Sequence, residues 1–215
     1  LLGSSVIPET SFGVHNGEVG IMMTHAPGKT VDKLFGKGKR EDFMDTLSPE
    51  ALGSLQRQLM ELEVCDILTG QGDRHGGNYM VDVTDGKVTV TGIDNDYCFG
   101  TASDGGVPKF VMGTNAILNM PRLIGKEMAD KVLALDFDRD VAPQYEGLLT
   151  DKEIAGAKHR HVELQKHVRK LQQDGYVVQD WVNWRAPDNK SAWDVLVAPG
   201  ENKARKPSMF VRDFL

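Results

Sequence analysis

The chain has 215 residues, of which 40% are hydrophobic and 26% are charged, and its formal net charge is −6. This composition is typical of one globular domain, or of one domain with a fragment of another. The negative charge argues against nonspecific binding to nucleic acid, which requires a basic surface. No apolar run is long enough to predict a transmembrane helix.

The two cysteines, Cys65 and Cys98, are too few for a disulfide framework, and neither lies in a C-x-x-C motif. No signal peptide is visible in the first residues. We therefore predict reduced, buried thiols and a cytoplasmic protein, or one that is delivered into a cytosol.

The first predicted element is a β-hairpin across residues 6–23. Apolar and β-branched residues lie on both sides of Asn16-Gly17, which is a strong signal for a two-residue hairpin turn. The second strand is expected to end in residues 24–28, which contain Pro and Gly. Residues 30–47 are polar and mixed, so we expect a short helix and loops there.

A long helix is predicted from Ser48 to about Leu68. Ser48 is a favourable N-cap, Pro49 suits the first turn, and apolar residues recur every three to four positions, which predicts one buried face. Gly70 is expected to end this helix. A second hairpin is predicted across residues 79–91, where Asp85-Gly86 separates two strand-like runs.

Two more helices are predicted, across residues 121–135 and 151–173. Thr150 and Glu153 form a capping-box pattern at the start of the second of these. Residues 101–120, before the first of them, form a long and weakly patterned segment that is typical of a functional loop. The tail after Gly175 contains three tryptophans, which we interpret as packing or docking residues.

Two loops on either side of the second hairpin carry residues that suit phosphoryl transfer. Residues 72–78 read GDRHGGN and residues 92–96 read GIDND. The amide oxygen of Asn78 and the carboxylate of Asp94 can bind Mg²⁺, which prefers oxygen ligands. Asp73 or His75 could orient an accepting hydroxyl or take its proton. Because the hairpin returns the chain, we expect Asn78 and Asp94 to face the same ion.

These motifs resemble the catalytic and metal-binding loops of the phosphatidylinositol 3- and 4-kinases and of actin-fragmin kinase, over roughly residues 6–135. Those kinases share the order Asp-Arg-His-x-x-Asn, followed after a hairpin by Ile-Asp. The resemblance implies an α+β, two-lobed protein-kinase-like fold that uses ATP with Mg²⁺ or Mn²⁺. It also implies that Asp73 and His75 are catalytic and that Asn78 and Asp94 are metal ligands.

The same resemblance divides the chain and locates the adenine. Residues 1–24 would end a truncated small lobe, 25–30 would be the hinge, 31–175 the large lobe, and 176–215 a C-terminal extension. Adenine would meet backbone groups around the hinge, so the nucleotide-binding candidates are Met23, Thr24 and His25 together with Asn78 and Asp94.

The chain departs from this family in two places. After Asp94 the family usually has Phe-Gly, whereas here Asn95 and Asp96 follow, and Asp96 could be a third metal ligand or a turn cap. The residues before the hinge contain no Lys and no glycine-rich phosphate loop. We therefore expect a partner segment to complete the small lobe, or a fold that is reduced.

Several residues have a structural interpretation as well. Asp and His are common in turns, and only their order with Asn78 and Asp94 favours catalysis. Arg74 is expected to pair with an acidic neighbour, and Asp66 is expected to have a solvated or a structural hydrogen-bonding role.

The leading hypothesis is an ATP- and Mg²⁺-dependent kinase that phosphorylates a hydroxyl of a protein or a phosphoinositide. The sparse positive charge of residues 101–120 favours a protein. The alternatives are a catalytically inactive kinase-like binding module and a kinase-fold enzyme that transfers AMP. The missing Lys favours the inactive module, whereas the intact Asp73, Asn78 and Asp94 oppose it.

Overall fold

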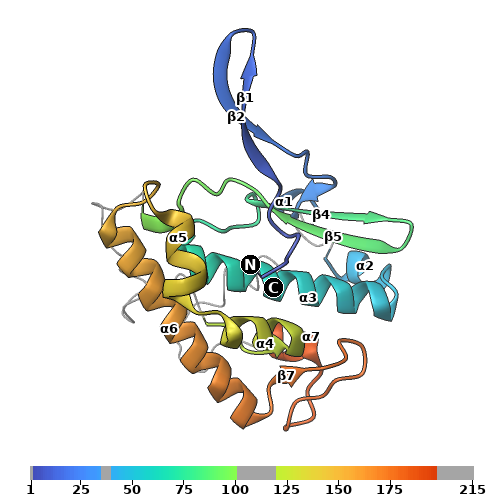
Figure 1. Cartoon of the computed structure of the whole chain (residues 1–215). Helices are drawn as coiled ribbons and strands as arrows, with labels where there is room; N and C mark the ends of the chain where they lie inside the picture. The colour runs from blue at the N-terminus through green and yellow to red at the C-terminus, as the bar shows by residue number, and fades with distance from the viewer. Residues whose placement is uncertain (1, 35–39, 101–119, 198–215) are drawn as a thin grey trace.

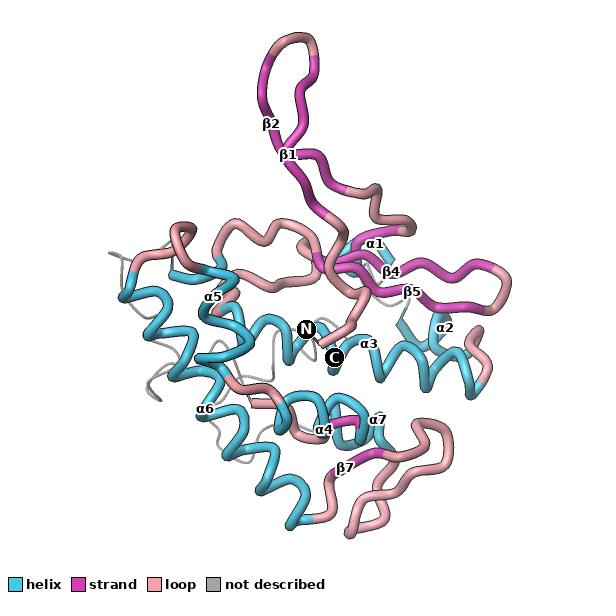
Figure 2. Tube along the Cα trace, in the orientation of Figure 1, coloured by secondary structure: helices cyan, strands magenta, loops and turns pink. Residues whose placement is uncertain are grey.

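A computed structural model describes residues 2–34, 40–100 and 120–197, and it shows an α+β fold. The long helix α3 (Pro49–Thr69) lies between a β-hairpin on one side and a group of helices on the other (Figure 1). The helix α6 (Asp151–Asp174) crosses one end of α3. A second hairpin stands away from this body (Figure 2).

Helix α3 begins and ends where local signals predict. The Ser48 hydroxyl accepts a hydrogen bond from the Ala51 amide at 3.2 Å, and Gly70 ends the helix in the left-handed conformation, with φ of 72°. The prediction of one buried face was too narrow. Leu59 and Met60, neighbours in sequence, are buried in different cores, because α3 has a packed layer on each side.

The first core joins α3 to a three-stranded antiparallel sheet. Its strands are β3 (Lys29–Thr30), β4 (Tyr79–Thr84) and β5 (Lys87–Gly92), in that order. Both turn residues between β4 and β5, Asp85 and Gly86, have positive φ, as the predicted hairpin requires. The buried side chain of Gln58 on α3 fastens β5, since it donates to the Val88 carbonyl at 2.8 Å and accepts from the Val90 amide at 2.9 Å.

The second core lies between α3, α6, α4 (Lys126–Ala134) and α7 (Ala192–Val197). The helix expected from residue 121 begins only at Lys126, because Ile124 and Gly125 form the strand β6 (Ile124–Gly125), which pairs in parallel with β7 (Val177–Val178). Residues from the predicted C-terminal extension, such as Val178 and Val195, are buried in this core.

Helix α6 has the predicted capping box, in which the side chains of Thr150 and Glu153 each bond to the backbone of the other. The tryptophans are partly buried against the cores, as a packing role predicts. The remaining short elements are α1 (Val31–Leu34), α2 (Arg40–Asp45), η1 (Cys98–Gly100), η3 (Phe137–Val141) and α5 (Ala142–Tyr145).

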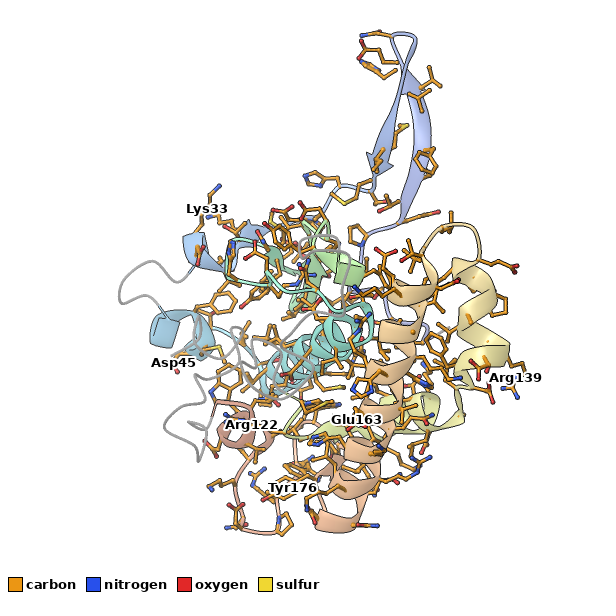
Figure 3. The ribbon with its side chains drawn as sticks, turned by 90° about the vertical axis from the view of Figure 1, so that its left-hand side faces the viewer. Lys33, Asp45, Arg122, Arg139, Glu163 and Tyr176 are labelled. Carbon is orange, nitrogen blue, oxygen red and sulfur yellow. The ribbon has the colours of Figure 1, made fainter. Side chains whose placement is uncertain are left out.

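The projecting hairpin consists of β1 (Thr10–His15) and β2 (Glu18–Met23), joined by Asn16-Gly17 as predicted. Within the described ranges it pairs with no third strand. The side chains of Phe12, Val14, Val19 and Ile21 are between 67% and 85% exposed. Figure 3 shows the side chains of this hairpin standing clear of the body.

Two expectations concern residues outside the described ranges. They are the functional loop, of which residues 101–119 are not described, and the last part of the C-terminal extension, from residue 198. In the ranges that are described, no helix combines the length and the apolar character needed to cross a membrane.

Candidate active site

The segment that follows α3, residues 71–78, is called here the Asp73 loop. It leaves the helix at Gly70 and enters β4 at Tyr79. The Asn78 amide donates to the His75 carbonyl at 2.7 Å, which closes a tight turn. The Asp32 amide donates to the Gly76 carbonyl at 3.1 Å and so fastens the loop to α1.

Asp73, His75 and Asn78 lie together in this loop. The Asn78 side-chain nitrogen donates to the Asp73 carbonyl at 2.8 Å and to the Asp73 carboxylate at 3.3 Å. This use of the nitrogen leaves the amide oxygen of Asn78 as the atom that can serve a cation. The Asp73 and His75 side chains are 46% and 42% exposed, so both can reach a substrate.

The orientation of His75 is set by its own loop. The Gly77 amide donates to His75 Nδ1 at 3.0 Å, so the neutral ring carries its proton on Nε2. That Nε2 atom lies 3.8 Å from Asp73 Oδ2, longer than a hydrogen bond but within ion-pair distance. The proton of His75 is therefore held on the side of the Asp73 carboxylate.

The second segment, residues 92–96, is called here the Asp94 loop, and it runs beside the first. The Ile93 amide donates to the Asn78 carbonyl at 2.9 Å. Asp94 has a φ of 57°, an uncommon conformation that Asp tolerates better than most residues. The side chains of Asp94 and Asp96 are exposed, whereas Asn95 between them is half-buried.

Arg74 is buried and joins the helix to both loops. Its guanidinium makes two hydrogen bonds to the Asp66 carboxylate on α3, at 3.0 and 2.9 Å. It also donates to the backbone carbonyls of Asn78 and Ile93 and to the side-chain oxygen of Asn95. The prediction that Arg74 pairs with an acidic residue is confirmed, and Asp66 has the structural role rather than the solvated one.

Gln71 is fully buried and joins the two loops directly. Its side-chain oxygen accepts from the Asp73 amide at 3.0 Å, and its side-chain nitrogen donates to the Asp94 carbonyl at 2.9 Å. The backbones at Asp73 and Asp94 are therefore held by the two ends of one amide group. Because Gln71 is packed at this junction, the spacing of the loops is fixed by the fold before any ligand binds.

Part of the chain that contains both loops is similar to a known protein family. Residues 32–123 match the model for phosphatidylinositol 3- and 4-kinase. Residues 32–123 are therefore a phosphatidylinositol 3- and 4-kinase-like core, called here the kinase-like core. No curated protein matches the chain. The match begins at Asp32, which is bonded to the Asp73 loop, and it spans α3, both loops and the β4–β5 hairpin between them.

The oxygen atoms of the kinase-like core suit a hard cation. In the described ranges no group of three or more His, Cys, Asp or Glu side chains is arranged as a metal site. The amide oxygen of Asn78 and the carboxylate of Asp94 are only two ligands, but both are oxygen ligands, which Mg²⁺ prefers. Two can be enough, because Mg²⁺ usually keeps several waters and binds through one or two carboxylates and the phosphates of its substrate. These two oxygen donors are therefore of the kind that fits Mg²⁺.

The expected adenine contacts lie outside the kinase-like match. Met23, Thr24 and His25 end the projecting hairpin, and all three are exposed. The Thr24 amide donates to the Glu9 carbonyl at 2.9 Å, which extends the β1–β2 ladder by one bond. A role for these residues at a nucleotide stays a prediction.

Burial changes the acidity of groups around the kinase-like core. It raises the pKa of Asp66 to about 6, although Arg74 opposes this shift. It also raises the pKa of Cys65 to about 12 and that of Cys98 above its ordinary value. Both thiols are therefore protonated at neutral pH. Both cysteines are free, as predicted, but they are partly buried rather than fully buried.

Three residues that organise the kinase-like core were not predicted from the sequence to do so. They are Gln71, Asn95 and Asp32. The one signal in the sequence concerned Gln71, which is a large polar residue between two glycines just before the motif. Asn95 replaces the Phe that is usual in the family, and its side chain accepts a hydrogen bond from Arg74.

Proposed function

We propose that this chain is the large-lobe part of a two-lobed, ATP- and Mg²⁺-dependent kinase that phosphorylates a hydroxyl group. The observation that carries the proposal is the bridge that Gln71 makes between the backbones at Asp73 and Asp94. Phosphoryl transfer depends mainly on positioning and on the neutralisation of charge, so a fixed spacing between an acceptor-binding carboxylate and a metal-binding carboxylate supports it.

In this proposal Asp73 acts on the accepting hydroxyl. Its half-exposed carboxylate accepts a hydrogen bond from that hydroxyl, orients it, and takes its proton as the oxygen attacks the γ-phosphorus of ATP and ADP leaves. His75 lies beside it with its proton on Nε2, and this proton can stabilise the negative charge of the same site. The Asn78 side chain keeps Asp73 in place through two hydrogen bonds.

Asn78 and Asp94 would hold Mg²⁺ or Mn²⁺, with Asp96 as a further carboxylate. A bound cation would neutralise charge on the phosphates of ATP. The residues of the chain contribute oxygen donors on two loops whose backbones are joined at Ile93 and Asn78.

The substrate is a hydroxyl of a protein or of a phosphoinositide. The name of the matched family favours an inositol lipid. Residues 101–120 contain Lys109 as their one basic residue, and this favours a protein because headgroup phosphates need positive charge. We propose a protein substrate on this ground. Phosphatidylinositol, offered in vesicles, is the alternative substrate to be tested.

The projecting hairpin supports the proposal of an incomplete small lobe. Phe12, Val19 and Ile21 are exposed on a ribbon of two strands, which is marginal by itself in water. We propose that a partner segment pairs beside residues 6–23 and supplies the Lys and the phosphate loop. The 215-residue chain alone should therefore bind ATP weakly or not at all, as calorimetry with and without Mg²⁺ would measure.

The experiment that tests the function measures phosphate transfer from ATP. The chain, with its partner segment once that is found, is offered protein extracts and phosphatidylinositol vesicles, with Mg²⁺ or with a chelator. Asp94→Ala should abolish transfer and leave the chain folded, because an exposed loop carboxylate contributes little packing and Ala at a φ of 57° costs only about 1–2 kcal/mol. Normal transfer by folded Asp94→Ala would contradict the assignment.

The mass of the product separates the alternatives. A product heavier by a phosphoryl group supports the kinase, and one heavier by an adenylyl group indicates AMP transfer. The remaining alternative is an inactive binding module. That module would bind no magnesium nucleotide and would modify no substrate under any of these conditions.

A further inference from the structure

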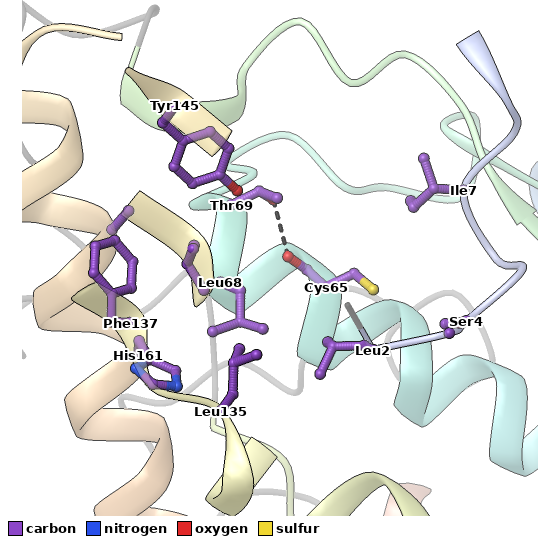
Figure 4. Close-up of a pocket in the computed structure, with 13 residues that line it drawn as sticks. Leu2, Ser4, Ile7, Cys65, Leu68, Thr69, Leu135, Phe137, Tyr145 and His161 are labelled. Atoms are coloured by element: carbon purple, nitrogen blue, oxygen red, sulfur yellow. Dashed lines mark hydrogen bonds between the residues drawn. The ribbon is translucent and has the colours of Figure 1, made fainter. Parts of the chain in front are cut away.

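A cavity of about 270 Å³ lies among the N-terminal segment, the last turns of α3, the η3–α5 segment and α6. No residue of the Asp73 and Asp94 loops lines it. Most of its wall is apolar, as Figure 4 shows. The apolar wall comes from Leu2, Ile7, Leu68, Leu135, Phe137 and Val141.

His161 on α6 contributes a polar atom to this apolar wall. The residue is 3% exposed, and its Nε2 atom has no hydrogen-bond partner in the described part of the chain. Figure 4 shows the imidazole next to Leu135 and Phe137. A buried polar atom without a partner costs about 1–3 kcal/mol, so a group that enters the cavity and bonds to Nε2 would gain by satisfying it.

The state of the imidazole narrows the kind of group that can bind. Burial lowers the pKa of His161, against the effect of a backbone hydrogen bond at Val132, so the ring is neutral at neutral pH. A neutral imidazole has one nitrogen that donates and one that accepts. A hydroxyl can do either, so it matches Nε2 in both tautomers. An ionised group would lose its hydration in an apolar cavity without an opposite charge.

The other walls suit an apolar body better than a water molecule. A buried water needs two to four polar partners. The Thr69 hydroxyl already donates to the Cys65 carbonyl at 2.9 Å. The centroids of the Phe137 and His161 rings lie 5.8 Å apart, and the ring planes are tilted by 39°. Aromatic surface therefore lies beside the unpaired Nε2 atom. Apolar cavities of roughly 150 Å³ already hold benzene, so this one accommodates a substituted ring.

We propose that this cavity binds a small apolar molecule with one hydroxyl group, of the alkylphenol or apolar alcohol class, and that His161 Nε2 is its hydrogen-bond partner. Phe137 and Leu68 would pack against the apolar body, and Ala157, which is 2% exposed, would form the floor on α6. This site is separate from the proposed kinase function and does not depend on it.

The test uses the full chain and two probes of nearly equal shape, 4-ethylphenol and 4-ethyltoluene. Binding is followed by amide chemical shifts in NMR titrations. We expect saturable shifts at residues 65–69, 137–141 and 157–161, and an affinity for 4-ethylphenol about fivefold higher, which is the worth of one hydrogen bond.

Three variants then assign the contact. His161→Phe keeps a ring but removes Nε2, so the two probes should bind equally. His159→Phe is the matched control, because His159 is exposed on the same helix, and it should keep the preference for the phenol. Ala157→Leu should fill the floor of the cavity and weaken both probes.

Two results would overturn the proposal. One is the absence of saturable shifts at these residues with either probe, which would mean that the cavity is closed or holds water. The other is equal affinity of the two probes for the unmodified chain, which would mean that Nε2 takes no part. Both results come from the unmodified chain, so they decide the matter even if His161→Phe does not fold.

Discussion

Arg74 and Asp66 form a buried, two-point ion pair. Two guanidinium nitrogens lie 3.0 and 2.9 Å from the two carboxylate oxygens, and each side chain is 2% exposed. The same guanidinium holds the carbonyls of Asn78 and Ile93. The pair therefore anchors both loops of the kinase-like core to helix α3, although neither residue faces solvent.

Removal of Asp66 should destabilise the fold strongly. Asp66→Ala leaves the Arg74 charge buried without a counter-charge, which typically costs about 3–5 kcal/mol. The measurement is urea unfolding at about pH 7.5, where the Asp66 carboxylate is ionised because its pKa is about 6. Asp130→Ala removes an exposed partner of Lys126 and is the matched control, with an expected change within about 1 kcal/mol. Equal losses in the two variants would show that the buried pair is not an anchor.

Gln71 and Gln58 offer a comparison of two buried glutamines that each bond to two backbone groups. Gln71→Leu and Gln58→Leu should both reduce the free energy of unfolding, by roughly 1–3 kcal/mol, because each removes two hydrogen bonds to the backbone. Only Gln71→Leu releases the backbones at Asp73 and Asp94.

Phosphate transfer should accordingly fall further in Gln71→Leu than its loss of stability explains. Gln58→Leu removes hydrogen bonds to β5 and none to the two loops. It should therefore keep its activity per folded molecule. The comparison is made with the partner segment present, as initial rates at saturating Mg²⁺, after correction for the folded fraction. If both variants lose the same activity, the Gln71 bridge does not position the site.

Asp73→Asn keeps the shape of the side chain and removes its charge. If Asp73 takes the proton of the accepting hydroxyl, the rate at saturation should fall by roughly 10²–10⁴-fold while the affinity for the magnesium nucleotide stays similar. Steady-state kinetics with varied nucleotide separates the two effects. A loss of affinity with an unchanged rate would instead make Asp73 a metal or structural residue and His75 the better base.

Glu63 predicts a dependence of stability on pH. Burial raises its pKa from 4.5 to about 8, and the charge of Arg122 opposes this only in part. The folded chain therefore binds this proton more tightly than the unfolded chain does. The contribution is fully present below about pH 4.5, and it is lost as the pH rises toward 8, with a slope of about 1.4 kcal/mol per pH unit.

Glu63→Gln should remove this slope. The free energy of unfolding of Glu63→Gln should therefore rise relative to that of the unmodified chain as the pH rises from 5 to 8. Urea unfolding at several pH values measures the difference. Glu127→Gln alters an exposed residue of α4 and should follow the unmodified chain over this range. A constant difference between Glu63→Gln and the unmodified chain would mean that Glu63 titrates normally.

The sequence by itself determined the elements whose signals are local. Ser48 and Gly70 limited α3 almost to the residue, Asn16-Gly17 and Asp85-Gly86 located both hairpins, and Thr150 located the start of α6. Each of these signals acts within a few residues through a cap or a turn, so it can be read without knowledge of the rest of the chain. The order of Asp73, Asn78 and Asp94 likewise indicated the kinase-like core that the family match supports.

Only the tertiary structure decided how these elements meet. Ile124 and Gly125 are a strand because Val177 and Val178 lie beside them, and α3 is buried on two sides because separate cores pack against it. Gln71 bridges to a carbonyl 23 residues away, and the cavity at His161 draws its wall from residues as far apart in sequence as Leu2 and His161. Contacts of this kind depend on the sum of many packing interactions across the chain, and no short stretch of residues encodes them.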